Sequence, residues 1–415
     1  MLILTVGTGT RPDVNIVMPL LKTIKDSTPQ FIGFIVSQES NKFAEEIIRQ
    51  LEFPSLQFDI LTLSDSDNLE SIYSRINDWM RSLVARGYSP QEITIDFTSG
   101  TKAMTSGVVL AGVAWGCAGL KYISGKRKNG VVQNGTERFI TVQPNTVLAH
   151  RQVEMGRNFI NEFRFDSAIS VFSSVNKALL EEWEIRLLDG YINVSRAYDC
   201  WDRFLQNRVD GYLSKVSDDL RELDIFRIPK EIRQRLIAIY KAQEKEEITE
   251  DMLGDLYNNA GRRFIEGKFD DATARLYRLV EMLAQMVLWK KHQIKTGDVP
   301  EDWIPTPLRK SFGENRDPKD GRIKIGLKKS YELLHGLDNP LGERYLQNKR
   351  ISGLLKQRND SFLAHGTKPI SSEACQGLFK ETEILLKTVV PNFDQLSEEL
   401  QFPWQSIERS DQRRK

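Results

Sequence analysis

Three polar residues in the last quarter of the chain could act together on a phosphodiester. Arg358 and Asn359 begin the segment RNDSFLAHG, and six residues separate Arg358 from His365. An arginine is always charged, and its planar fork of N–H groups fits phosphate oxygens. A histidine side chain ordinarily titrates at about pH 6.5 and can move protons near neutrality, while the asparagine could orient either group. The segment therefore combines phosphate binding with proton transfer and does not require a metal.

A single amphipathic helix is expected to position this segment. Apolar residues recur at steps of three and four, which predicts a helix over Leu346–His365 that stops at Gly366. The face defined by this spacing carries Ile351, Leu354, Leu355, Arg358, Phe362 and His365. Because seven residues make nearly two turns, Arg358 and His365 would lie about 20° apart around the axis and about 10 Å apart along it.

Spacing alone leaves two interpretations of this polar pair open. Arg358 could be the buried partner of a carboxylate, with His365 capping the helix at its C-terminus, where the dipole favours a cation. Alternatively, the apolar face meets a second copy of the chain, and the cleft between the copies holds two arginines and two histidines. The second interpretation gives a use to polar groups whose burial otherwise costs free energy.

Helical patterns rich in Leu, Arg, Glu and Lys dominate from about residue 147 to 400. The segments at 155–172 and 260–277 share Gly-Arg-x-Phe-Ile followed by Phe-Asp-x-Ala, and each predicts a helix, a turn and a second helix. At the end of the second repeat and just after it, Arg275, Arg278 and Glu281 follow one another at three-residue steps. They could orient the helix of Arg358, or they could merely form a salt-bridged surface.

The first 143 residues instead alternate between strand-like and helix-like segments. Six apolar runs predict strands: LILTVG, QFIGFIVS, LQFDILTL, EITIDFTS, LKYISG and RFITVQ. Helical patterns separate them at 14–27, 41–51, 68–86 and 101–117, and KRKNGVVQNG predicts an exposed turn region or hairpin. This alternation predicts a mostly parallel six-stranded sheet covered on both faces, so the fold class is an α/β domain followed by an all-α half.

Polar loops follow three of the predicted strands, at the edge where open parallel sheets bind ligands. These loops are 7–11 (GTGTR), 37–40 (SQES) and 98–102 (TSGTK). The last opens into a helix whose N-terminal amides favour an anion, and Lys102 adds a cation. The loops can also be plain turns and caps. Neither the GxGxxG fingerprint nor the Gly-Lys-Ser/Thr of a nucleoside-triphosphate loop is complete, which argues against dinucleotide or triphosphate chemistry.

The segments GTGTRPDVN and DFTSGTKAM resemble the two ligand loops of a CARF domain, the Rossmann-like sensor of type III CRISPR systems. The resemblance covers about the first 145 residues. It implies a homodimer that binds cyclic oligoadenylate on its two-fold axis, with cyclic tetra-adenylate favoured over hexa-adenylate. The residues expected to bind it are Gly9, Thr10, Arg11, Asn15, Ser37, Gln38, Thr98, Ser99, Gly100, Thr101 and Lys102.

The segment RNDSFLAH resembles the Arg-x(4–6)-His motif of HEPN ribonucleases. Behind a CARF-like domain, it implies a CARF–HEPN ribonuclease that the cyclic oligoadenylate activates. The expected reaction is metal-independent cleavage of single-stranded RNA, in which the 2′-hydroxyl attacks phosphorus and leaves a cyclic phosphate and a 5′-hydroxyl. Arg358, Asn359 and His365 would be catalytic, and Arg275, Arg278 and Glu281 would support them.

Two other functions are compatible with parts of this pattern, and a third is disfavoured by it. The protein could sense a cyclic nucleotide and signal through its helical half without cutting RNA. The ligand site could also degrade its own ring. A deoxyribonuclease would need clustered carboxylates and a lysine on strands, which the all-α half does not offer.

The composition limits the class of protein further. A chain of 415 residues with 40% hydrophobic and 28% charged residues is expected to fold into two or three domains. A net charge of +1 provides no broad positive field for stable DNA binding. The cysteines Cys117, Cys200 and Cys375 form no zinc pattern and suit a reducing cytoplasm. No apolar run reaches the roughly 18 residues that a membrane span needs.

We accordingly expect a cytoplasmic protein with no metal or cofactor and no membrane association. The expected domains are a ligand-sensing domain at 1–145, a helical linker at 146–250, a HEPN-type nuclease domain at 251–400 and a flexible tail at 401–415.

Overall fold

The computed structural model of the protein describes residues 1–9, 16–51, 56–128, 131–132 and 135–405. The chain forms two compact units. One contains Met1–Met155 with Ser174–Glu182, and the other contains Gly156–Ser173 with Trp183–Lys415. The division of the helical half into a linker and a nuclease domain near residue 250 stays a prediction.

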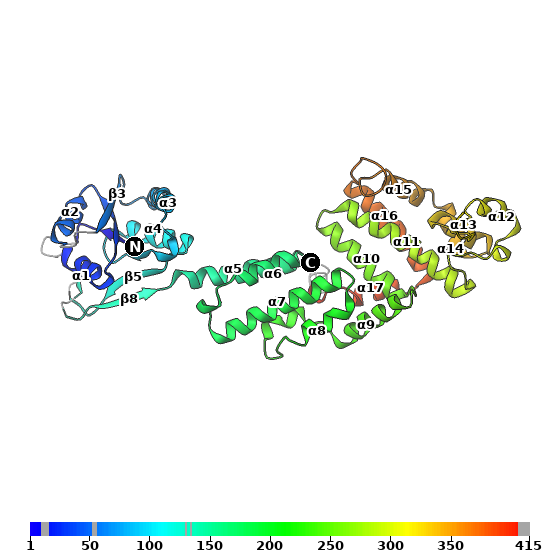
Figure 1. Ribbon diagram of the computed structural model, residues 1–415, viewed down its shortest axis with the longest axis horizontal. Coiled ribbons are helices and arrows are strands. Elements are labelled where there is room, and N and C mark those ends of the chain that lie inside the picture. The colour runs from blue at the N-terminus through cyan, green and yellow to red at the C-terminus, as the bar shows by residue number, and fades with distance from the viewer. Residues whose placement is uncertain (10–15, 52–55, 129–130, 133–134, 406–415) are drawn as a thin grey trace, which may run out of the picture. The chain divides into compact units, whose positions relative to one another are not determined.

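A six-stranded sheet in the order β3-β2-β1-β4-β5-β8 forms the centre of the first unit (Figure 1). Its strands are β1 Leu2–Val6, β2 Phe31–Ser37, β3 Gln57–Leu63, β4 Thr94–Asp96, β5 Gly119–Ser124 and β8 Arg138–Val142. All neighbours pair in parallel except β5 and β8. Strands β6 Arg127–Lys128 and β7 Val131–Val132 form the expected hairpin. The predicted mostly parallel sheet is confirmed.

Helices cover both faces of the sheet because its strands are apolar on both sides (Figure 1). These helices are α1 Val17–Ser27, α2 Asn41–Gln50, α3 Leu69–Ala85 and α4 Lys102–Trp115. Leu2, Leu4 and Val6 of β1 pack with α1 and α2. Ile3 of the same strand packs with Ile95 of β4 against α3 and α4, as the alternation of side chains along a strand requires.

The rest of the described chain is helical, which confirms the predicted all-α half. Its helices are α5 Pro144–Asn161, α6 Phe165–Ser174, α7 Glu182–Asp202, α8 Val209–Leu213, α9 Lys230–Glu244, α10 Glu250–Ile265, α11 Phe269–His292, α12 Thr306–Gly313, α13 Leu327–Gly336, α14 Pro340–Gln347, α15 Lys349–Asn359, α16 Ser372–Val389 and α17 Phe393–Glu399. Short 3₁₀ turns lie at Pro90–Glu92, Lys177–Leu179, Gln206–Arg208, Arg221–Phe226 and Glu301–Trp303. None of the helices in the described ranges is long and apolar enough to cross a membrane.

The two similar sequence segments each form a helical hairpin, as predicted: α5 with α6, and α10 with α11. Their glycines differ in environment. A Cβ on Gly156 would lie 2.3 Å from the Phe172 ring, whereas a Cβ on Gly261 would meet nothing within 4 Å. The glycine therefore permits close packing of a hairpin only in the first copy.

One apolar core joins α10, α11, α13, α14, α15 and α16. Helix α11 is central to this core and packs against α10, α13, α15 and α16 (Figure 1). Its contribution includes Leu276, Leu279, Val280 and Leu283, all of which are fully buried. Helix α11 therefore provides the support on which α15, with Arg358 near its end, is placed.

Candidate ligand site and candidate active site

The predicted ligand loops meet where β1 and β4 lie side by side. The chain leaves β1 toward β2 on one side and β4 toward β5 on the other, so this is the crossover point of the sheet. The Gly7 amide donates to Ser99 Oγ at 3.0 Å. The Thr5 hydroxyl donates to the Ser99 carbonyl. The loop after β1 and the loop after β4 are therefore joined into one surface.

Glycines allow these two loops to approach each other closely. A Cβ on Gly7 would lie 2.7 Å from the Gly100 nitrogen, which no real side chain tolerates. Gly100 has φ +115°, a backbone conformation that L residues rarely adopt. The glycines of the Gly-Thr-Gly and Ser-Gly-Thr motifs thus determine the shape of the loops. Gly9 is also exposed.

Buried polar groups hold the second loop from below. Asp96 is fully buried at the end of β4, and its Oδ1 accepts from the Thr98 amide at 2.7 Å. Burial raises the pKa of the Asp96 carboxyl above its usual range. Thr98 Oγ1 accepts from the Ile123 amide of β5 at 3.0 Å, and Thr101 caps α4 by accepting from the Met104 amide at 3.1 Å. The hydroxyls of Thr98 and Thr101 therefore have structural partners.

Two of the predicted ligand side chains, Lys102 and Gln38, are exposed, whereas the hydroxyls of Ser37 and Ser99 already have hydrogen-bond partners. Lys102 is exposed and is the first residue of α4, where the helix dipole also favours an anion. Gln38 is exposed, Ser99 is half-buried, and Ser37 at the end of β2 is half-buried and hydrogen-bonded to Ser40 at 3.2 Å. The predicted ligand residues Thr10, Arg11 and Asn15 lie outside the described residues.

The helix that carries Arg358 is shorter than predicted. Helix α15 ends at Asn359, and the chain then turns, so His365 does not lie on the helix. The Ser361 amide donates to the Arg358 carbonyl at 3.1 Å, and the His365 amide donates to the Asn359 carbonyl at 3.2 Å. The turn brings the His365 backbone back to the end of the helix. A loop, and not the expected helix, therefore places His365 close to the helix end that carries Arg358.

This loop is fixed at both ends. Its first residues follow α15, which Asn348 caps by accepting from the Ile351 amide at 3.0 Å. Asn348 also donates to Glu381 of α16 at 2.7 Å. At the far end, the Ile370 amide donates to Asp270 Oδ2 in the first turn of α11 at 3.0 Å. Helices α11 and α16 together position the segment that carries the candidate catalytic groups.

Arg358 is half-buried but has no carboxylate partner among the described residues, so the ion-pair interpretation is not supported. Its Nη1 donates to Asn359 Oδ1 at 3.2 Å, as expected for an orienting asparagine. Its guanidinium carbon lies 4.2 Å from the centre of the Tyr277 ring on α11. His365, seven positions further along the chain, is exposed. An unneutralised guanidinium and an exposed imidazole suit phosphate binding and proton transfer.

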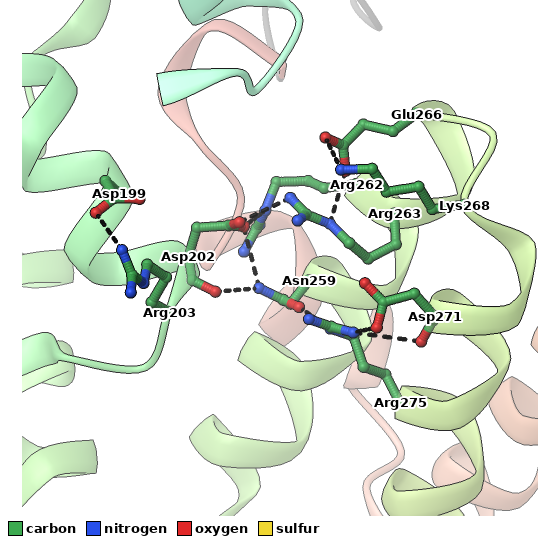
Figure 2. Close-up of polar contacts among 10 residues, drawn as sticks. All are labelled: Asp199, Asp202, Arg203, Asn259, Arg262, Arg263, Glu266, Lys268, Asp271 and Arg275. Atoms are coloured by element: carbon green, nitrogen blue, oxygen red, sulfur yellow. Dashed lines mark hydrogen bonds and ion pairs between the residues drawn. The ribbon is translucent and has the colours of Figure 1, made fainter. Parts of the chain in front are cut away.

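The predicted supporting residues form ion pairs of their own. Arg275 donates to Asn259 and Asp271 (Figure 2). Arg278 pairs with Glu281 at 2.6 Å on the surface. Within the described ranges none of the three is hydrogen-bonded to Arg358, Asn359 or His365. Arg278 and Glu281 thus form a surface ion pair, whereas half-buried Arg275 joins Asn259, and a supporting role for the three residues stays a prediction.

A buried polar network, missed by the sequence reasoning, connects α7, α10 and α11 (Figure 2). Asp202 of α7 accepts from Arg262 Nε and from Arg263 Nη2, each at 2.7 Å. It also accepts from Asn259, which in turn accepts from Arg275. Arg262 is 1% exposed and lies over the Phe402 ring at 3.9 Å. The repeated Gly-Arg-x-Phe-Ile motif marks Arg262 in the sequence, but only packing brings Asp202 to it.

Asp255, beside this network, predicts a pH dependence of stability. It is 1% exposed, accepts from Trp201 and Gln206, and burial raises its pKa from 3.8 to about 6. Because the folded pKa exceeds the unfolded one, its contribution to stability is full below about pH 4 and is lost as the pH rises through 6. We expect the free energy of unfolding of Asp255→Asn, relative to that of wild type, to increase by roughly 3 kcal/mol between pH 4 and pH 7. Urea unfolding at each pH measures this difference. Asp302→Asn, at an exposed position, should show no such change with pH. If the stability of Asp255→Asn and that of wild type vary with pH in parallel, the raised pKa of Asp255 is contradicted.

Substitution of Gly366 tests whether the conformation of the loop that holds His365 is required. A Cβ there would lie 1.9 Å from the Asp360 carbonyl oxygen, so Gly366→Ala must displace the loop that holds His365. A displacement of about 1 Å can cost about 100-fold in rate. We therefore expect the RNA cleavage that the HEPN resemblance implies to fall by that factor, with little change in melting temperature. Gly353 of α15 is the matched control, because a Cβ there meets nothing within 4 Å. An active Gly366→Ala variant would show that the loop conformation is not required.

Fold and site together define a class: a Rossmann-like domain with an anion-suited loop edge, followed by an all-α half with an Arg–Asn…His segment. Within the described residues no group of three or more His, Cys, Asp or Glu side chains could hold a metal. Residues 241–388, which include the candidate catalytic segment, match the family model of the Csm6 HEPN domain.

The whole chain also resembles a solved structure, that of Enterococcus italicus Csm6 bound to cyclic hexa-2′-fluoro-hexa-dAMP. The two are 12% identical, the TM-score is 0.54, and the match covers 98% of this chain and 99% of the other. No match is found among the curated proteins. The predicted resemblance to CARF–HEPN proteins of type III CRISPR systems is thereby confirmed.

Proposed function

We propose that the protein is a cyclic-oligoadenylate-activated endoribonuclease that cleaves single-stranded RNA in the cytoplasm during type III CRISPR antiviral defence. The observation that carries the proposal is the state of Arg358. Its side chain is half-buried and has no carboxylate partner among the described residues. Arg358 lies in the last turn of α15, within the region that matches the Csm6 HEPN domain.

In the proposed reaction the 2′-hydroxyl of the substrate attacks the adjacent phosphorus. Arg358 binds the phosphate and stabilises the charge that develops on its oxygens. His365 moves a proton at the attacking or the leaving oxygen, and Asn359 holds the guanidinium through its Oδ1. The P–O5′ bond breaks, which leaves a 2′,3′-cyclic phosphate and a 5′-hydroxyl. DNA lacks the attacking hydroxyl and should therefore survive.

The proposed active form is a homodimer in which two copies of the Arg358–His365 segment share one RNA cleft. Two apolar side chains support this form: Phe362 and Leu363, in the loop before His365, are 64% and 57% exposed. Contiguous exposed apolar surface can mark a site of protein–protein interaction. A second copy of the chain would cover them and supply the second Arg and His.

The proposed activator is a cyclic oligoadenylate that binds the joined loops after β1 and β4. The exposed Lys102, the N-terminus of α4 and the glycine amides suit repeated phosphates. We favour cyclic tetra-adenylate, while the similar Csm6 structure holds a cyclic hexanucleotide analogue, so both ring sizes belong in the test. Ring binding would act by favouring the cleavage-competent arrangement of the dimer.

A time course with end-labelled single-stranded RNA tests the proposal. The arms are no activator, cyclic tetra-adenylate and cyclic hexa-adenylate, each with and without EDTA, with a DNA of the same sequence as control. The proposal expects ring-dependent, EDTA-resistant cleavage of RNA alone, with cyclic phosphate ends. Ring binding without cleavage would instead support a sensor that signals without nuclease activity, and consumption of the ring would show that the ligand site degrades its activator.

A further inference from the structure

The contact between Arg358 and Tyr277 has no counterpart in the sequence motif. Arg358 Cζ lies over the Tyr277 ring at 4.2 Å from its centre. Tyr277 is half-buried on α11, where it packs at the edge of the helical core. Its ring is therefore held by the helix that also anchors the far end of the catalytic loop through Asp270 and Ile370.

The ring affects the guanidinium differently from a carboxylate. A carboxylate would occupy the N–H donors of Arg358 and cancel its charge. An aromatic face attracts the cation through its quadrupole and contacts the flat side of the guanidinium, which leaves the in-plane N–H groups free. Only the bond from Nη1 to Asn359 at 3.2 Å uses a donor of Arg358 within the described residues. Its Nε is buried without a partner there, so the Nη groups are the donors left for a phosphate.

Orientation matters because an arginine side chain is long. It has many rotamers, and the one hydrogen bond to Asn359 does not by itself fix the plane of the guanidinium. A ring beneath the guanidinium restricts that plane before RNA arrives. The donors then need not be reorganised when charge develops on the phosphate, which is the condition for strong electrostatic stabilisation.

We infer that Tyr277 is a positioning residue of the active site, which holds the Arg358 guanidinium by its ring face and keeps the N–H donors free for the scissile phosphate. The inference rests on the proposed ribonuclease function and adds to it a residue outside the Arg–Asn…His segment. Tyr277 acts through Arg358 and does not contact the substrate itself.

Substitution at Tyr277 gives the first half of the test. With saturating activator, Tyr277→Leu should lower kcat for RNA cleavage by roughly 3- to 30-fold, with KM changed by less than about twofold. Tyr277→Phe keeps the ring and should restore most of kcat, because the phenolic hydroxyl is not part of the contact. If wild type cleaves RNA and Tyr277→Leu has the same kcat, the inference is overturned.

Fluorination separates the role of the ring charge from packing. Phenylalanine with one, two or three ring fluorines is placed at position 277 by suppression of a stop codon; each fluorine weakens the quadrupole with little change of shape. The logarithm of kcat should fall steadily along the series, while the same series at Phe379, whose ring has no cation over it in the described structure, should leave kcat unchanged. A flat series at 277 would assign Tyr277 to packing alone. An inactive wild type would instead overturn the proposed function, and this positioning role with it.

Discussion

Replacing His365 with alanine is expected to lower activator-dependent RNA cleavage by about 100- to 10,000-fold. His365 is the exposed imidazole of the loop that folds back onto Asn359, and it supplies the proposed proton transfer. The loss should fall on kcat, because alanine removes the proton carrier and leaves Arg358 and its contact with Tyr277 in place. Cleavage rates of labelled RNA at saturating activator measure the effect.

Two comparisons make this result specific. His335 is an exposed histidine on α13, and His335→Ala should cut RNA at the wild-type rate. The affinity of His365→Ala for the cyclic oligoadenylate should equal that of wild type, because the ligand loops belong to the other compact unit. Wild-type cleavage by His365→Ala would remove His365 from the mechanism.

Reversing the charge at Lys102 is expected to raise the activator concentration for half-maximal cleavage by about 10- to 100-fold. Lys102 is exposed at the N-terminus of α4, directly after the Ser-Gly-Thr loop. A glutamate there would repel a phosphate and would offset the positive end of the helix dipole that attracts it. The maximal rate should stay at the wild-type value, since Arg358 and His365 are unchanged. Activation curves at fixed RNA concentration measure both quantities.

Lys25→Glu is the matched control for this experiment. Lys25 is an exposed lysine in the last turn of α1, so the charge change is the same but lies far from the β1–β4 loop surface. Its activation curve should coincide with that of wild type. A Lys102→Glu curve that also coincides would place the activator elsewhere, whereas a lowered maximal rate would point to a defect in coupling between the two units.

Local sequence patterns predicted the α/β unit well, for a simple reason. The strands of the sheet are short apolar runs and the covering helices have clear periodicity, so each element is specified by residues close in sequence. The meeting of the loops after β1 and β4 also follows from general rules of parallel sheets. What the pattern could not show is that the Thr98 and Thr101 hydroxyls are bound by backbone groups of β5 and α4.

The end of α15 shows where periodicity fails. The residues after Asn359 continue the apolar spacing, so a helix to His365 was expected. The chain turns there because backbone bonds from Ser361, His365 and Gly366 close a tight loop, and Gly366 permits the approach to the Asp360 carbonyl. Over six residues, the apolar spacing is compatible with either a continued helix or a turn. Backbone hydrogen bonds decide between the two conformations, and the sequence pattern does not reveal those bonds.

By itself, the sequence determined the fold class of each half and the edge of the sheet that suits an anion. It also determined that Arg358 and His365 occur together in one short segment. These features depend on neighbours in the chain. The tertiary structure alone decided that Arg358 lies on the Tyr277 ring, with no carboxylate partner in the part of the chain that the structure describes. It also decided that Arg275 joins the network of Asp202. Such contacts join residues far apart in sequence, and they depend on how helices pack, which local patterns do not specify.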